Sequence, residues 1–410
     1  MIELIKAEAA RRHADIITWR RHLHAHPELS YQETSTGKYI AVQLRELGIE
    51  VREGIAGTGV IGVVRGSKPG NGCICLRADI DALPIQEKNI CDYRSTNDGV
   101  MHACGHDAHS AMVLGAGAIL HALCEEWGGT VLLLFQPGEE KIPGGATLVL
   151  KEDALRDPRP SAIMGQHCTP ELEVGKLGFR EGPFMASSDE LYITVKGRGG
   201  HAAQPEKLID PIMITARLLP RLKEEFAATW SAGHPGPHQA GQAFPGRVPG
   251  GPNPLLAFGR VEALGATNVV PDEVRIAGTL RAFNEPLRDE LHAWLPKRAN
   301  EICAEQGGSC DFEVRKGYPV LVNDDALTAR MRSAAEELLG AENVVRMEQR
   351  MGSEDFAFYT HVMPGCFFRL GTGVPGAPTR NLHMPTFDID EDALRIGAEM
   401  MVMGAIQELG

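Results

Sequence analysis

The segment Met101–Ala111, M-H-A-C-G-H-D-A-H-S-A, constrains this chain more than any other stretch. It places one thiol and three imidazoles within eight residues: Cys104, His102, His106 and His109. Small and apolar residues follow at helical spacing, so we expect the cluster where a loop enters a buried helix. Thiolate, imidazole and carboxylate together are ligands for a borderline metal ion. Four such groups in one turn-sized window favour a metal site over a buried core histidine or a chance Cys-Gly-His run.

Composition narrows the class of protein. At 410 residues the chain is long enough for two domains, and 43% hydrophobic content is that of an ordinary globular protein. A net charge of −13 argues against nucleic acid or an anionic membrane as a partner. We find neither an apolar signal core nor a run of about 18 apolar residues, so no membrane segment is expected. Nine cysteines without a secretory signal indicate reduced thiols and a cytoplasmic location.

The two ends of the chain alternate strands with helices. This order predicts an α/β domain with a mostly parallel central sheet, formed by residues 1–186 and 318–410. The expected helices are 3–29, Thr34–Leu47, Asp107–Glu125, Asp325–Leu339 and Glu391–Leu409. The expected strands are Gly59–Val64, Cys73–Arg77, Thr130–Phe135, Ala162–Met164 and Cys366–Leu370.

Residues 187–317 read as a smaller domain inserted into the larger one. Their pattern is β-α-β-β-α-β, the order of a small α+β sandwich of one sheet and two helices. The expected elements are Asp189–Lys196, Pro211–Phe226, Leu255–Glu262, Glu273–Phe283, Pro286–Gln306 and Cys310–Lys316. Between the first helix and the second strand, residues 231–254 are rich in Pro and Gly and carry His234 and His238. We expect an exposed loop without fixed structure there.

Polar residues gather after the strands of the larger domain, where open α/β sheets bind their ligands. The collected groups are Cys104, His106, Glu139, Glu140, His167 and His383. Five ligands are more than one tetrahedral site needs and are suited to two metal ions. One carboxylate of the six groups is then left to act as general acid/base. Spacing alone does not say whether Glu139 or Glu140 is the free carboxylate. Asp79 and Asp81 follow another strand, where a loop cap and a site role are equally good interpretations.

The chain resembles the dinuclear metallo-amidohydrolases, which include hippurate hydrolases, bacterial aminoacylases, N-acetyl-diaminopimelate deacetylases and plant auxin-conjugate hydrolases. Nine motifs in the same order carry the resemblance over nearly the whole chain. They are R-R-H-L-H-A-H-P-E-L-S-Y-Q-E-T, L-R-A-D-I-D-A-L-P, M-H-A-C-G-H-D-A-H, F-Q-P-G-E-E, G-Q-H, G-R-G-G-H-A-A-Q-P, N-V-V-P-D, M-G-S-E-D-F and N-L-H. The loop at 231–254 is longer and richer in Pro and Gly than expected for this family.

The resemblance assigns roles to individual residues. It implies that two divalent metal ions are bound, with Cys104 as the bridge, by Cys104, His106, Glu140, His167 and His383. It implies that Glu139 is the general acid/base. The inserted domain would act as a lid and carry the dimer interface, and His201 would reach an active site, from the partner subunit, to steady the oxyanion. Asn268 and Arg281 fall where related enzymes hold the substrate carboxylate.

Other polar residues have less specific interpretations. We read His102 and His109 as packing groups or supports for the ligands, and Asp107 as a helix N-cap or a partner of a ligand imidazole. Glu354 and Asp355 either face the site or are ordinary exposed acids after a glycine. The three histidines of the H-L-H-A-H run are read as structural: His22, His24 and His26.

The function expected from these observations is hydrolysis of the linear amide of an N-acyl amino acid, with zinc, manganese, nickel or cobalt as the metal. The nearest alternative is a carboxypeptidase or dipeptidase with the same dinuclear site, and we expect a homodimer or higher homo-oligomer in either case. A cysteine hydrolase with Cys104 as nucleophile would leave Glu139, Glu140, His167 and His383 without a role. A non-catalytic binding protein would not need a free Glu139.

Overall fold

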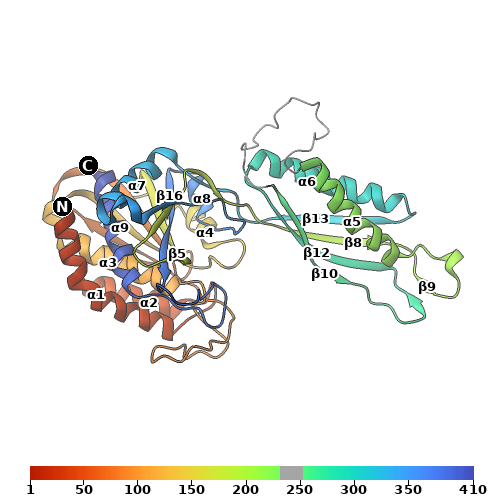
Figure 1. The fold of residues 1–410 in the computed structure, drawn as a ribbon, viewed down its shortest axis with the longest axis horizontal. Helices are drawn as coiled ribbons and strands as arrows, with labels where there is room; N and C mark the ends of the chain where they lie inside the picture. Colours follow the sequence, from red (N-terminus) through yellow and green to blue (C-terminus); the bar gives the residue numbers. More distant parts are fainter. Residues whose placement is uncertain (231–252) are drawn as a thin grey trace. The chain divides into compact units, whose positions relative to one another are not determined.

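The computed structural model describes residues 1–230 and 253–410, so the sequence prediction for the loop at 231–254, with His234 and His238, lies almost wholly outside the described residues. The chain forms two compact units (Figure 1). Unit 1 consists of Met1–Gly182, Val322–Glu348 and Glu354–Gly410. Unit 2 consists of Pro183–Leu321 and Gln349–Ser353. Within the described residues, no helix is long and apolar enough to cross a membrane.

Unit 1 is built on an eight-stranded sheet with the order β1-β2-β4-β3-β5-β16-β6-β15. The four central strands, β4, β3, β5 and β16, run parallel to one another, while β1, β2 and β6 run antiparallel to a neighbour. The strands are β1 Glu50–Ile55, β2 Gly59–Arg65, β3 Lys68–Asp79, β4 Gly128–Gln136, β5 Ala162–Glu173, β6 Leu177–Phe179, β15 Val344–Arg346 and β16 Gly365–Gly373. The predicted α/β class with a mostly parallel sheet is confirmed.

The central helix of unit 1 is α3, which begins at the Cys/His cluster and is buried along almost its whole length. Its glycines allow close packing: a Cβ on Gly115 would lie 2.6 Å from Ile16 of α1, and one on Gly117 would lie 2.4 Å from Leu133 of β4. Helices α1, α3 and α9 pack side by side (Figure 1). The helices of unit 1 are α1 Ile2–Ala25, α2 Thr34–Glu46, α3 His106–Ala122, α4 Gly145–Lys151, α7 Asp325–Leu339, α8 Ala357–Thr360 and α9 Asp392–Leu409.

Unit 2 has a four-stranded antiparallel sheet with the order β10-β12-β8-β13, against which α5 and α6 pack (Figure 1). Its elements are β8 Asp189–Lys196, α5 Pro211–Trp230, β10 Leu255–Glu262, β12 Glu273–Arg281, α6 Glu285–Ala304 and β13 Ser309–Lys316. The strand β8 alternates as its sequence predicts, with Leu191, Ile193 and Val195 buried. The β-α-β-β-α-β order is confirmed. A two-stranded ribbon extends the unit, formed by β9 Gly200–His201 and β11 Val269–Val270.

Three sequence predictions need correction. The helix predicted at 3–29 ends at Ala25. The strand predicted at Ala162–Met164 continues to Glu173, so His167 lies inside β5 and pairs with Arg369 of β16. Its polar G-Q-H sequence suggests a strand end, although Gln166 and His167 are both buried in the parallel ladder. The edge strand β1 is missing from the prediction because its sequence, E-V-R-E-G-I, is mostly polar and has no fully buried residue.

Candidate metal centre

The chain turns sharply between the two parts of the central motif. Gly105 is the N-cap of α3 and has a φ of 89°, a left-handed conformation that glycine adopts without strain. This turn places Cys104 in the loop before the helix and His106 in its first turn. The parallel strands β3 and β4 end at the same edge of the sheet, where they are followed by Asp81 and by Glu139 and Glu140. The sheet therefore brings the carboxylates to the start of α3.

Cys104 is shared by two groups of metal-ligating atoms. One group is Cys104, His106 and His167, and the other is Cys104, Glu140 and His383; within each, the atoms lie within 4.8 Å of one another. The Cys104 Sγ lies 3.4 Å from His167 Nε2 and 3.3 Å from His383 Nε2. His383 Nε2 in turn lies 3.4 Å from Glu140 Oε1. Two three-atom groups with a common sulfur have the form of a dinuclear site with a thiolate bridge.

The loop that carries His383 is held in an unusual backbone conformation. His383 has a φ of 60°, which is rare for a residue other than glycine, and its side chain is 55% exposed. Its N–H donates a hydrogen bond of 2.7 Å to the carbonyl of Ala103, next to Cys104. Strained backbone that is fixed by such a contact is common at functional sites.

The orientation of the imidazoles fits metal ligation. A carbonyl oxygen can only accept, so His106 Nδ1 donates to Asp81 O at 2.9 Å and His167 Nδ1 donates to Cys168 O at 2.7 Å. In the neutral form of each ring, Nε2 is then the unprotonated nitrogen and can bind a metal ion. His106 Nε2 and Glu140 Oε1 are buried and have no hydrogen-bond partner within the described structure. These two buried ligand atoms, together with a thiol, fit a borderline divalent cation.

The charges of the site also favour a cation. Burial, together with Glu140 and Glu139, raises the pKa of the Cys104 thiol well above its ordinary value. Burial likewise raises the pKa of Glu139, and the neighbouring carboxylates of Glu354 and Glu140 raise it further. Although burial opposes the shift, Asp79 and Asp81 raise the pKa of His106 to about 10. A bound cation would reverse the effect on the thiol and offset the excess of carboxylates.

The remaining residues of the motif lie outside the two groups that share Cys104. The His109 Nδ1 donates to Asp79 Oδ1 at 2.7 Å, and its Nε2 accepts from the Cys168 N–H at 2.9 Å, so both nitrogens are used. His102 is buried, and burial lowers its pKa to about 4, so it packs as a neutral ring. The N-cap interpretation of Asp107 is wrong, because Gly105 is the N-cap. Asp107 Oδ2 instead lies 2.8 Å from both Arg20 Nε and His24 Nδ1.

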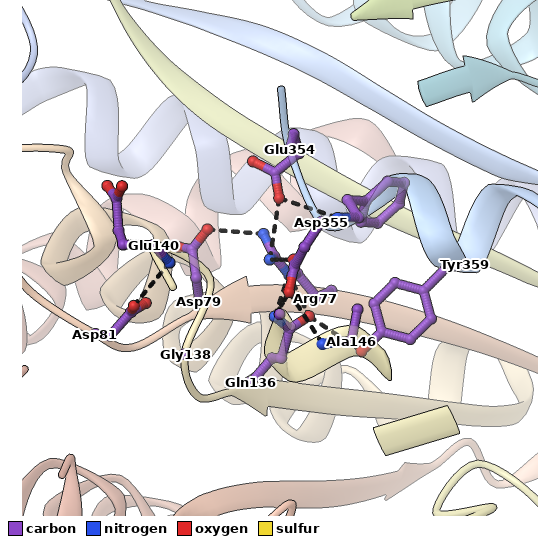
Figure 2. Close-up of polar contacts among 12 residues, drawn as sticks. Arg77, Asp79, Asp81, Gln136, Gly138, Glu140, Ala146, Glu354, Asp355 and Tyr359 are labelled. Atoms are coloured by element: carbon purple, nitrogen blue, oxygen red, sulfur yellow. Dashed lines mark hydrogen bonds and ion pairs between the residues drawn. The ribbon is translucent and has the colours of Figure 1, made fainter. Parts of the chain in front are cut away.

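A polar network that the sequence analysis missed lies beside the metal centre (Figure 2). Its hub is Arg77 of β3, which is 1% exposed. Arg77 Nε donates to Gln136 Oε1 at 3.0 Å, and Nη1 donates to Asp79 Oδ2 at 2.7 Å. Nη2 donates to Asp355 Oδ1 at 2.8 Å and lies 3.1 Å from Glu354 Oε1. Glu354 and Asp355 are therefore buried partners of Arg77 rather than exposed acids. The sequence signal for this network was the arginine inside the apolar run C-I-C-L-R-A.

The three candidates of unit 2 separate into two places. His201, in β9, is exposed and pairs with Val269, and the Ala202 N–H donates to Asn268 O at 3.0 Å, so His201 and Asn268 are neighbours. Arg281 is the last residue of β12, and its Nη1 donates to Ser353 Oγ at 2.8 Å. The nine residues of β12 place Arg281 about 27 Å from the end of the sheet that leads to His201.

Comparisons with known proteins agree with this geometry. The model described as peptidase family M20/M25/M40 matches residues 75–405. The N-acetylcysteine deacetylase of Bacillus subtilis (strain 168) is 38% identical over 390 residues, which cover 94% of this chain and 95% of that protein. Thermostable carboxypeptidase 2 of Saccharolobus solfataricus is 33% identical over 412 residues, with coverage of 99% and 98%. A solved structure, the Bacillus subtilis YXEP protein, described as a dinuclear metal binding peptidase, superposes with a TM-score of 0.81 at 35% identity, covering 98% of this chain and 99% of that one.

Proposed function

The chain belongs to peptidase family M20/M25/M40, and we propose that it is a metal-dependent amidohydrolase that cleaves N-acyl amino acids into a carboxylate and a free amino acid. The observation that carries this proposal is the sharing of Cys104 between two groups of ligand atoms, with Glu139 beside them. A structural metal site would not need a further buried carboxylate at that position.

Five residues would hold two divalent ions, of zinc, manganese, nickel or cobalt: Cys104, His106, Glu140, His167 and His383. When bound, the ions would polarise the amide carbonyl and lower the pKa of a water molecule toward neutrality. Glu139 would accept the proton of that water and deliver it to the nitrogen of the departing amine. The raised pKa of Glu139 supports this role, because a more basic carboxylate accepts a proton more readily and can then deliver it as an acid.

Unit 2 would complete the site. His201 would donate a hydrogen bond to the oxygen on which negative charge develops, while Asn268 and Arg281 would bind the carboxylate of the amino acid. An N-acyl amino acid spans about 8 Å, because consecutive Cα atoms are 3.8 Å apart. Arg281 lies about 27 Å along β12 from the end of the sheet that leads to His201, so we infer that one substrate does not contact both residues of the same unit 2. If both act on one substrate, they come from two subunits, which supports a homodimer with unit 2 as lid and dimerisation domain.

A carboxypeptidase or dipeptidase activity is the second candidate. It is favoured by the carboxypeptidase relative, which is matched along almost the whole of both chains. The two activities use the same site and differ in whether a free α-amine is accepted on the acyl side.

Substrate profiling tests the proposal. The metal-free protein would be reconstituted with each of the four metals and assayed on N-acetyl and N-benzoyl amino acids and on dipeptides. We expect hydrolysis of N-acyl substrates, abolished by a chelator and restored by metal. Preference for dipeptides would favour the second candidate. Activity that survives complete metal removal would contradict both candidates and favour a cysteine hydrolase.

A further inference from the structure

Glu139 belongs to two groups of close polar side chains. In the first its carboxylate is within 4.8 Å of ligand atoms of His106 and Glu140, and in the second it is within 4.8 Å of carboxylate oxygens of Glu354 and Asp355. The first group belongs to the candidate metal centre. The second group holds Arg77. The proposed base is thus close both to the candidate metal centre and to the two acids that hold a buried guanidinium.

The two acids on the arginine side are held differently. Asp355 is fixed on both oxygens, which accept hydrogen bonds of 2.7 to 3.0 Å from Arg77, from Gln136 Nε2 and from the Ala146 N–H. Glu354 is 2% exposed, and its Oε1 lies 3.1 Å from Arg77 Nη2 and accepts from the Phe356 N–H at 3.1 Å. Glu354 is therefore a buried carboxylate whose position depends on Arg77 (Figure 2).

An arginine in this position competes for the base. Attraction between opposite charges is strong where water is excluded, and removing one partner of a buried pair leaves a charge that seeks another. Against the effect of burial, four acids raise the pKa of Arg77, and Glu139 is among them. An ion pair between Glu139 and Arg77 would turn the lone pairs of Glu139 away from the metal centre.

We propose that Glu354 is a positioning residue: it occupies the Nη2 edge of Arg77 and so keeps the Glu139 carboxylate on the side of the metal centre. The inference deepens the proposed function, since it assumes that Glu139 acts there as general base. Glu354 acts through Glu139 and does not touch the substrate. This positioning role requires the negative charge of Glu354 more than the shape of its side chain.

Glutamine at position 354 tests this role with little change in shape. Glu354→Gln keeps an oxygen that can accept from Arg77 and Phe356 but removes the charge. We expect kcat on an N-acyl amino acid to fall by about 10- to 100-fold with KM changed less than about threefold, as for other residues that orient a catalytic group. Bound metal should stay at the wild-type amount. A crystal structure of the metal-free variant should show the Glu139 carboxylate paired with Arg77.

Two further variants separate positioning from stability. Glu399→Gln is the matched control, because Glu399 is also a buried glutamate of unit 1 paired with an arginine, Arg395, at 2.7 Å; its turnover should match the wild type. Glu354→Asp restores the charge and should recover most of the turnover lost in Glu354→Gln. If Glu354→Gln does not fold, the aspartate variant can still overturn the inference, which requires its kcat to stay within about threefold of wild type.

The outcomes distinguish this inference from the proposed function. If the wild-type enzyme hydrolyses no N-acyl substrate, the proposed function fails. If the wild type is active and Glu354→Gln turns over as fast as Glu399→Gln, the positioning role is wrong. It is also wrong if the aspartate and glutamine variants are equally slow, or if Glu139 keeps its wild-type position in the structure of Glu354→Gln.

Discussion

The strand geometry of unit 2 predicts that two inactive variants restore each other's activity. The variants are His201→Ala, which removes the proposed oxyanion donor, and Glu139→Ala, which removes the proposed base. Arg281 lies about 27 Å along β12 from the end of the sheet that leads to His201, whereas the substrate spans about 8 Å. We consider an active site that combines Arg281 and Glu139 of one subunit with His201 of the partner subunit. The two variants then remove residues that different subunits contribute to the same site.

The size of the recovery follows from two-fold symmetry. Loss of an oxyanion donor lowers turnover by about 10²–10³, so His201→Ala alone should be nearly inactive, as should Glu139→Ala. In a mixed dimer, one site contains both defects and the other contains neither. Random exchange makes half of the dimers mixed, so about a quarter of all sites should be intact. The mixture should therefore reach about a quarter of the wild-type rate per site.

The assay is dissociation of the two variants together, followed by reassociation and measurement of hydrolysis. Native mass spectrometry with one variant carrying a mass tag would measure the fraction of mixed dimers. Each variant taken alone through the same procedure is the control and should stay inactive. Verified mixed dimers that recover no activity would show that His201 acts within its own chain or has no catalytic role.

Three further predictions concern single residues. Glu139→Gln should keep its metal and lose turnover by about 10²–10⁴, measured by elemental analysis and kinetics; near-normal turnover would exclude Glu139 as the base. Cys104→Ser and His106→Ala should each lose bound metal, so retention of two ions at wild-type affinity would refute that ligand assignment. Asp189→Asn should lower the free energy of unfolding by about 2 kcal/mol at pH 7, because hydrogen bonds from His292 and an arginine lower the pKa of Asp189 from 3.8 to about 2, against the effect of burial. This stabilisation is complete above pH 3.8 and is lost as the pH falls toward 2, so in urea denaturation the difference should shrink over that range.

Local pattern was enough to predict most elements of this fold. Strand β8 and helix α7 have the predicted bounds, because alternation and helical periodicity of apolar residues are clear in their sequences, and β10 has the predicted bounds as well. The apolar pattern failed to predict strands where the burial of a segment does not match the polarity of its sequence. Polar, largely exposed β1 gives no apolar signal, whereas β5 continues through Gln166 and His167, which the parallel ladder buries.

The residues of the candidate site also fall into those that the local sequence reveals and those that only the fold brings together. The ligand candidates were found because Cys104 and His106 are neighbours and because Glu139, Glu140 and His383 stand in recognisable motifs. The Arg77 network was not found, because its partners other than Asp79 are distant in sequence: Asp355 is 278 residues away. A sequence can show that a buried strand contains an arginine, but only the fold supplies the carboxylates that make its burial tolerable.

The surroundings of Cys104 decide between a nucleophile and a metal ligand. A catalytic cysteine needs a lowered pKa, which a cationic neighbour provides. Here burial, Glu140 and Glu139 raise the pKa of the thiol. His167 contacts the sulfur, but burial, and then Arg369, lower the pKa of His167 well below its ordinary value, so its ring is neutral and cannot stabilise a thiolate. A divalent cation shared by the two ligand groups would stabilise the Cys104 thiolate. The burial that makes Cys104 a poor nucleophile therefore makes its thiolate dependent on metal, and this favours the dinuclear hydrolase over the cysteine hydrolase.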